Sequence, residues 1–123
     1  MRLDGRIGQI AVVVNDVAKA KAFYVGVLGL ELLFDAGPEL SFLRAGTTRL
    51  MLTRPQGHGT PGANSVLYFQ VQDIEAVHAS CIERGAISER LPQLTARMPD
   101  HELWIGFLRD PDGNLVGLME ERR

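Results

Sequence analysis

The sequence predicts an α+β fold of two β-α-β-β-β modules, whose paired, curved mixed sheets enclose a cleft. Three observations support this prediction. Segments with the hydrophobic period of a strand alternate with segments that have the period of a helix, the order of these segments repeats along the chain, and short sequence motifs repeat with it. The 123 residues, 46% of them hydrophobic and 23% charged, fit one globular domain spanning residues 1–123. Module one is placed at about 7–54, the connector at 54–64 and module two at about 65–120.

The first module begins with a β-branched segment, residues 7–14, that predicts a buried strand. Asp16 is the expected N-cap of the next helix, because its carboxylate can accept hydrogen bonds from the free amides of the first turn. Apolar residues then recur at helical spacing as far as Leu28, and Gly29 is the expected stop. Turn dipeptides separate three further expected strands, at about 31–35, 39–44 and 48–53.

The second module repeats this order after a connector rich in proline and glycine. A strand is expected at 65–71, a helix from the N-cap Asp73 to Gly85, and further strands near 86–91, 101–109 and 114–120. The turn between Asp110 and Asn114 contains Pro-Asp-Gly, which favours a tight hairpin with glycine in the left-handed position. Residues 12–17 match residues 69–74, and residues 49–52 echo residues 115–118. The sequence therefore indicates an internal duplication.

Composition excludes several classes of partner. A formal charge of −2 produces no field that would attract nucleic acid or an acidic membrane. Cys81 is the single cysteine, so no intrachain disulfide can form, and its helical position predicts a small buried hydrophobe. Residues 1–8 lack the apolar core of a signal peptide, and the apolar stretch 24–34 is too short to cross a bilayer. We therefore expect a cytoplasmic protein with no nucleic-acid or membrane partner.

Three motifs carry a resemblance to a known superfamily: IGQIAVVVNDVAKAKAFYVGVLGLEL at 7–32, RLMLTRP at 49–55, and FLRDPDGNLVGLMEE at 107–121. Together they resemble the vicinal oxygen chelate superfamily of glyoxalases, bleomycin resistance proteins and dioxygenases, over nearly the whole chain. The resemblance implies the paired-module fold and a homodimer, since members commonly dimerise. The sequence leaves open whether the modules pair within one chain or between two.

The resemblance also identifies the positions at which enzymes of this superfamily hold a divalent metal. Those positions are occupied here by Gln9, Met51, Val66 and Gly117. Only Gln9 offers an oxygen, whereas a divalent cation needs three or more converging donors. Phe107 stands where extradiol dioxygenases carry an active-site tyrosine. We therefore expect no metal and no cofactor.

Strand alternation and the pairing of the last hairpin predict which residues line the cleft. The expected cleft is mostly apolar with a few polar anchors, which is typical of a small-molecule pocket. Each anchor has a structural alternative, such as a satisfied backbone group or a solvated side chain. The expected ligand-binding residues are Gln9, Arg49, Met51, Val66, Tyr68, Gln70, His101, Phe107 and Gly117.

The three histidines have different expected roles. His101 can change charge near neutral pH and has acidic neighbours, so it is the candidate catalytic acid or base, with a structural role as the alternative. His78 lies on the apolar face of the second helix and is expected to be a satisfied core residue. His58, in the connector, is expected to be solvated. Trp104 should face the helix-covered core.

These observations favour a metal-free protein that binds a small, mostly apolar or aromatic molecule, in sequestration, resistance or secondary metabolism. The alternative is a glyoxalase-like lyase or isomerase, or a dioxygenase-like enzyme, with a displaced metal site or metal-free catalysis by His101. A third hypothesis, a structural interaction domain, predicts a cleft filled by Met51, Phe107 and Met119. The sequence leaves open whether the protein is an enzyme.

Overall fold

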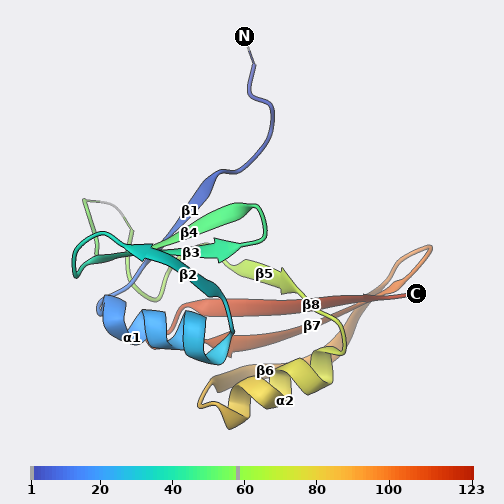
Figure 1. Cartoon of the computed structure of the whole chain (residues 1–123). Helices are drawn as coiled ribbons and strands as arrows, with labels where there is room; N and C mark the ends of the chain where they lie inside the picture. The colour runs from blue at the N-terminus through green and yellow to red at the C-terminus, as the bar shows by residue number, and fades with distance from the viewer. Residues whose placement is uncertain (1, 58) are drawn as a thin grey trace. The chain divides into compact units, whose positions relative to one another are not determined.

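A computed structural model describes residues 2–57 and 59–123 (Figure 1). The chain forms two compact units, Met1–Pro61 and Gly62–Arg123. Each unit contains a four-stranded mixed sheet and a helical segment that follows its first strand. The predicted α+β class and the duplicated order of elements are confirmed.

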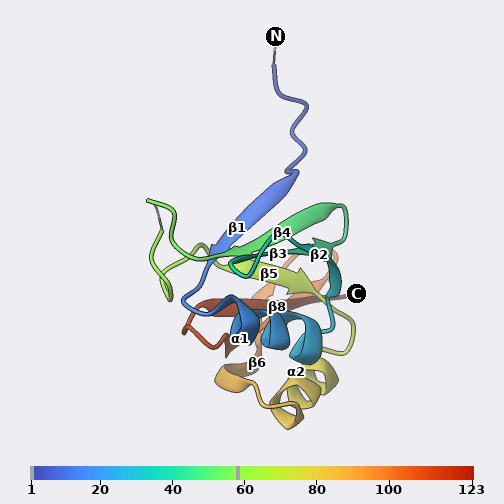
Figure 2. The ribbon, with the colours of Figure 1, turned by 60° about the vertical axis from the view of Figure 1, so that its left-hand side comes forward.

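In the first unit the sheet has the strand order β1-β4-β3-β2. Strands β1 and β4 are parallel, and the other neighbours are antiparallel. Figure 2 shows the helical segment on one side of this sheet. The elements are β1 (Gln9–Val13), α1 (Val17–Lys21), the π-helix η1 (Ala22–Val27), β2 (Glu31–Asp35), β3 (Leu40–Ala45) and β4 (Thr48–Thr53).

The core of this unit lies between the sheet and its helical segment. Val12, Leu50 and Leu43 face the helices and are at most 3% exposed. The Asp16 carboxylate accepts a hydrogen bond from the Lys19 amide at 3.1 Å, which confirms the predicted N-cap. Lys19 and Ala22, on the other side of the segment, are exposed, so burial of the apolar face holds α1 and η1 on the sheet.

The helical segment departs from the regular helix that its apolar spacing predicts. Its second half is a π-helix, in which the Leu28 amide donates to the Phe23 carbonyl at 3.0 Å. A π-turn rotates each residue by less than an α-turn, so the consecutive Phe23 and Tyr24 point to the same side. Both rings are buried, with their centroids 5.1 Å apart in an edge-to-face contact. Gly29, with φ of +85°, ends the segment as expected.

In the second unit the sheet has the strand order β5-β8-β7-β6, with β5 and β8 parallel. It repeats the topology of the first unit, because the first and last strands of each module are adjacent and parallel. The elements are β5 (Leu67–Gln70), α2 (Ile74–Glu83), β6 (Ile87–Arg97), β7 (Glu102–Arg109) and β8 (Leu115–Arg122).

Strand β6 is longer than expected, and the sequence-based end at Leu91 is wrong. Pro92 breaks the strand pattern in the sequence, but β6 lies at the sheet edge, where a missing amide hydrogen is tolerated. The register between β6 and β7 shifts at three places, including the stretch between Arg90 and Gln93. These bulges accommodate the proline, and the resulting hairpin extends beyond β5 (Figure 1).

The Asp110–Asn114 hairpin forms as predicted and also anchors the connector. The Asp110 amide donates to the Asn114 carbonyl at 2.9 Å, and Gly113 has φ of +84°. Asn114, only 3% exposed, uses its side-chain oxygen to accept from the Gly62 amide at 2.8 Å and from Asn64 Nδ2 at 2.7 Å. The turn motif therefore holds residues 62–64 as well as two strands.

The N-terminus of α2 is tied to β8 through Glu120. The Glu120 carboxylate accepts hydrogen bonds from the Ile74 amide at 3.1 Å and the Asp73 amide at 3.0 Å. Asp73, the predicted N-cap, accepts from the Ala76 amide and adopts φ of +57°. The bond from the Ile74 amide, together with those from Asp73 and Arg122, lowers the pKa of Glu120.

Glu120→Gln is expected to lower stability at neutral pH but not in acid. Because the folded-state pKa of Glu120 lies below its ordinary value of 4.5, the ionised carboxylate stabilises the fold above that pH. This contribution disappears as pH falls through the lowered pKa. We expect the variant to lose about 1–2 kcal/mol at pH 7 and progressively less between pH 5 and pH 3, measured by urea denaturation. Glu83→Gln, an exposed change on α2, is the control; a loss independent of pH would contradict the assignment.

Candidate functional site

In the first unit, the predicted site residues lie on the sheet face opposite the helices. Gln9 pairs with Arg49 across β1 and β4, and Met51 follows on the same face. Arg49 Nε donates to Gln9 Oε1 at 2.8 Å, and Gln9 Nε2 lies 3.6 Å from Met51 Sδ. Both ends of the Gln9 amide are thus engaged by neighbouring side chains.

Two phenylalanines extend this face, and the sequence analysis missed both. Phe42 in β3 pairs with Met51, and the Arg49 guanidinium lies 5.0 Å from the centre of its ring. Phe34 in β2 stacks on Phe42 with centroids 4.6 Å apart and is 48% exposed. Strand pairing would have identified them in turn, because Phe42 pairs with Met51, already assigned to this face, and Phe34 pairs with Phe42.

In the second unit, three of the predicted residues meet around Gly117. Tyr68 in β5 and Phe107 in β7 both pair with Gly117 in β8, which confirms the predicted Phe107–Gly117 register. A Cβ on Gly117 would lie only 2.5 Å from Tyr68 Cδ1. The Tyr68 ring therefore covers the point from which a side chain at position 117 would project. Its centroid lies 5.8 Å from that of Phe107, in an edge-to-face contact.

Arg90 joins this cluster from β6 and was missed by the sequence analysis. It pairs with Phe107, and its guanidinium carbon lies 4.8 Å from the centre of the Phe107 ring. Alternation does not predict this face for Arg90, because bulges on both sides of it shift the register of the strand.

Two further predicted residues of this unit, Gln70 and Val66, lie in β5 or next to it. Gln70 pairs with Met119 and is exposed, while Met119 is half-buried. Val66 precedes β5 and is half-buried. Trp104 pairs with Glu120, which reaches α2, so the indole lies on the helix side of the sheet as predicted.

His101 lies away from the aromatic cluster. It precedes β7 and is six residues from Phe107, a separation of roughly 20 Å along a strand. Its Nδ1 lies 2.7 Å from Asp100 Oδ1, and its Nε2 lies 3.9 Å from a Glu121 carboxylate oxygen. The hydrogen bond with His101 lowers the pKa of Asp100. His101 is thus oriented by acidic groups, but the structure does not bring it to Tyr68 or Phe107.

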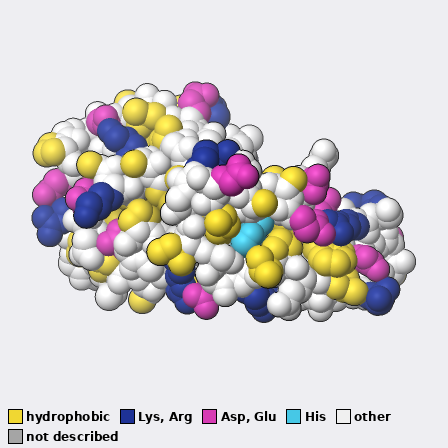
Figure 3. All heavy atoms as spheres, turned by 90° about the horizontal axis from the view of Figure 1, so that it is seen from below, with side chains coloured by type: hydrophobic (Ala, Val, Ile, Leu, Met, Phe, Trp, Pro, Cys, Tyr) yellow, Lys and Arg dark blue, Asp and Glu magenta, His cyan; other side chains and the backbone are white. Residues whose placement is uncertain are grey.

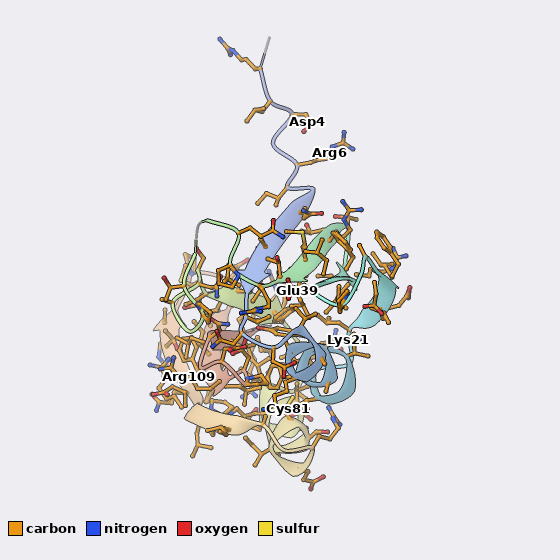
Figure 4. The ribbon with its side chains drawn as sticks, turned by 90° about the vertical axis from the view of Figure 1, so that its left-hand side faces the viewer. Asp4, Arg6, Lys21, Glu39, Cys81 and Arg109 are labelled. Carbon is orange, nitrogen blue, oxygen red and sulfur yellow. The ribbon has the colours of Figure 1, made fainter. Side chains whose placement is uncertain are left out.

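His78 is a satisfied core residue, as predicted. It is 3% exposed, and its Nε2 lies 3.1 Å from the Ser88 hydroxyl. Hydrophobic side chains form patches among charged ones on the face that Figure 3 shows. Cys81, which Figure 4 places on α2, is buried as expected, and burial raises the pKa of its thiol. His58, expected to be solvated, lies outside the described residues.

Surface hollows lie elsewhere in both units. One of about 500 Å³ adjoins the N-terminal segment that carries Asp4 and Arg6 (Figure 4). One of about 600 Å³ lies between α2 and β6 and includes His78 and Leu91. One of about 440 Å³ is lined by His101 and its neighbours. Tyr68, Phe107 and Gly117 line none of these three hollows.

The residues at the positions where the resemblance implies metal ligands do not fit a divalent cation. The Gln9 amide is engaged by Arg49 and Met51, and the Tyr68 ring covers Gly117. Within residues 2–57 and 59–123, no three His, Cys, Asp or Glu side chains gather where they could hold a metal. No step of a reaction can be derived through a metal from these donors.

Comparison with known proteins identifies the class to which this fold belongs. The model of the Glyoxalase/Bleomycin resistance protein/Dioxygenase superfamily matches residues 6–118, and the chain belongs to this superfamily. Human mitochondrial methylmalonyl-CoA epimerase is 32% identical over 95 residues, which cover 73% of this chain and 52% of that protein. The bovine epimerase is 34% identical over 84 residues, covering 64% of this chain and 46% of its own length. The chain therefore spans about half the length of these relatives.

Solved structures of similar fold include binding proteins and enzymes. An antibiotic-binding protein from Streptomyces sp. CB03234 is 27% identical, with a TM-score of 0.79 and coverage of 98% of this chain and 99% of its own. Lactoylglutathione lyase from Agrobacterium tumefaciens is 24% identical, with a TM-score of 0.77 and coverage of 96% and 95%, which establishes the shared fold alone. None of the helices in the described residues has the length and apolar character needed to span a membrane.

Proposed function

We propose that this protein binds a small, largely aromatic molecule without a metal ion, in sequestration, resistance or secondary metabolism. The observation that carries the proposal is the Tyr68 ring lying over Gly117, one of the positions at which the resemblance implies a metal ligand. An aromatic surface thus takes the place of a metal donor. The exposed half of Tyr68 leaves its ring available to a ligand.

The similarity to an antibiotic-binding protein supports this proposal, because that protein matches nearly the whole chain. We further propose that the protein acts in the cytoplasm as a homodimer, with a small molecule as its ligand and neither nucleic acid nor membrane as a partner. The net charge of −2 is consistent with this choice of partners.

A second candidate function is an isomerase or lyase, or a dioxygenase-like enzyme, favoured by the 32% identity to methylmalonyl-CoA epimerase. In that case a displaced metal or a proton transfer by His101 would carry the reaction. The bond between His101 and Asp100 would orient the imidazole for such a transfer. The binding function is preferred because His101 lies far along the sheet from the aromatic cluster.

Calorimetric titration with 2-naphthalenemethanol, a neutral planar probe, tests the binding proposal. We expect the wild type to bind it without added metal, and Tyr68→Ala to weaken binding about tenfold, since an aromatic contact contributes about 1–2 kcal/mol. Leu91→Ala removes another exposed side chain, one that lies on a different surface of the same unit, and is the matched control.

Elemental analysis of protein purified without chelators separates the two candidate functions. The binding proposal predicts much less than one bound metal ion per chain and probe affinity that EDTA does not change. Stoichiometric zinc, iron, nickel or manganese, together with probe binding lost in EDTA, would overturn it. Catalytic turnover of a substrate that is abolished by His101→Ala would instead favour the second candidate function, an enzyme.

A further inference from the structure

Most arginines of the two sheets are neutralised by neighbouring carboxylates. Arg44 pairs with Glu31, Arg109 with Glu89, and Arg97 with Glu102. Arg49 and Arg90 differ, because neither forms an ion pair with any acidic residue in the part of the chain that the structure describes. These two guanidinium groups keep their full charge available on the faces opposite the helices.

Each of these arginines belongs to a triad with two aromatic rings. In the first unit Arg49 lies on Phe42, and Phe34 stacks on the same ring. In each triad one ring, called here the inner ring, contacts the guanidinium: Phe42 in the first unit and Phe107 in the second. The other ring, called the outer ring, is 48% exposed: Phe34 in the first unit and Tyr68 in the second. The triads are Arg49, Phe42 and Phe34 in the first unit, and Arg90, Phe107 and Tyr68 in the second.

The inner rings of the two triads occupy equivalent positions in the repeat, but the arginines come from strands that are not equivalent. Phe42 pairs with Met51 and Phe107 with Gly117, so the two inner rings occupy equivalent positions of the repeat. The arginine comes from β4 in the first unit and from β6 in the second. The same chemistry is thus assembled from non-equivalent strands, so the module repeat alone does not account for it.

The geometry suits a ligand that is both planar and negatively charged. A guanidinium stacked on a ring is held flat and presents its N–H edge to a carboxylate in two parallel hydrogen bonds. Arg49 is further fixed because its Nε donates to Gln9 Oε1, and no described residue accepts a hydrogen bond from its terminal nitrogens. In the second unit, the Arg90 carbon and the Tyr68 ring centre lie 4.8 and 5.8 Å from the Phe107 ring centre. Both groups thus adjoin the same ring, where a bicyclic aromatic acid can contact the two of them together.

We infer that the ligand of this protein is a planar aromatic acid, whose ring contacts the exposed aromatic side chain and whose anionic group binds the unpaired guanidinium of a triad. The inference rests on the proposed binding function and specifies its ligand class. The alternative is that the two arginines are solvated and only cover the phenylalanine rings. That alternative predicts that the protein binds charged and neutral aromatic ligands equally well.

The test compares 2-naphthoate with 2-naphthalenemethanol, which have the same ring system and differ in charge. By calorimetry we expect the wild type to bind the acid about tenfold more tightly than the alcohol, a preference that shrinks as salt is raised. The acid-to-alcohol affinity ratio should fall toward one in the double variant Arg49→Met/Arg90→Met. The single variants show which triad supplies the preference. Arg54→Met and Arg97→Met remove ion-paired arginines and are the matched controls.

The possible outcomes separate the inference from the proposed function. Loss of charge preference in the double variant, with the preference kept in both controls, supports the inference. Equal wild-type affinity for the two probes, or an unchanged ratio in the double variant, overturns it while leaving the binding function intact. Binding of neither probe by the wild type overturns the binding function and the inference with it.

Discussion

Replacing Asp110 by alanine is expected to lower the free energy of unfolding by about 3–5 kcal/mol, because three hydrogen bonds to one buried carboxylate are lost together. Asp110 is 3% exposed. Its Oδ1 accepts from the Asp112 and Asn114 amides at 2.9 and 2.8 Å, and its Oδ2 accepts from Asn114 Nδ2 at 2.8 Å. The measurement is chemical denaturation followed by circular dichroism at pH 7.

The size of this effect also depends on the contacts that Asn114 makes with the connector. Without the Asp110 carboxylate, the Asn114 side chain is no longer held in the orientation in which it accepts hydrogen bonds from the Gly62 amide and from Asn64 Nδ2. Asp110→Asn preserves shape and should cost less than Asp110→Ala. Pro111→Ala, an exposed change in the same turn, is the control and should cost less than 1 kcal/mol. An Asp110→Ala loss as small as that of Pro111→Ala would show that the network contributes little.

This hairpin illustrates how far the sequence allows the fold to be predicted. Its turn type, strand pairing and glycine conformation follow from local chemistry, since the residues involved are adjacent in the chain. The tie from Asn114 to Gly62 joins residues 52 positions apart, and no local pattern contains it. From the sequence, Asp110-Pro-Asp-Gly therefore predicts a turn and nothing beyond it.

The candidate site shows the same division between local and distant information. The face occupied by Tyr68, Phe107 and Gly117 could be predicted, because alternation along regular strands determines it. The contribution of Arg90 could not, because Pro92 and the bulges of β6 alter the alternation that such a prediction needs. The widening of the first helix at Phe23 likewise depends on packing in the core rather than on local propensity.

Gly117→Ala is expected to impair binding as well as folding. The added Cβ would lie 2.5 Å from Tyr68 Cδ1 and 2.9 Å from Cε1, so the ring must leave its position over residue 117. Tyr68 is half-exposed and can rotate toward solvent, which limits the loss of stability to about 1–3 kcal/mol. The aromatic surface is nevertheless disrupted, so affinity for 2-naphthalenemethanol should fall at least tenfold, or about 1.4 kcal/mol, by calorimetry.

A double-mutant cycle with Tyr68→Ala assigns this effect to the ring. If displacement of Tyr68 is the cause, Gly117→Ala should cost little further stability or affinity once the ring is removed, giving a coupling energy of about 1–2 kcal/mol. Gly26→Ala is the control, because a Cβ at that glycine meets no atom within 4 Å. Additive effects of the two substitutions would show that Gly117→Ala acts other than through the Tyr68 ring. Wild-type affinity in Gly117→Ala would show that the ligand does not use the surface formed by Tyr68. Coupled effects would instead place the ligand on the Tyr68 ring that covers residue 117.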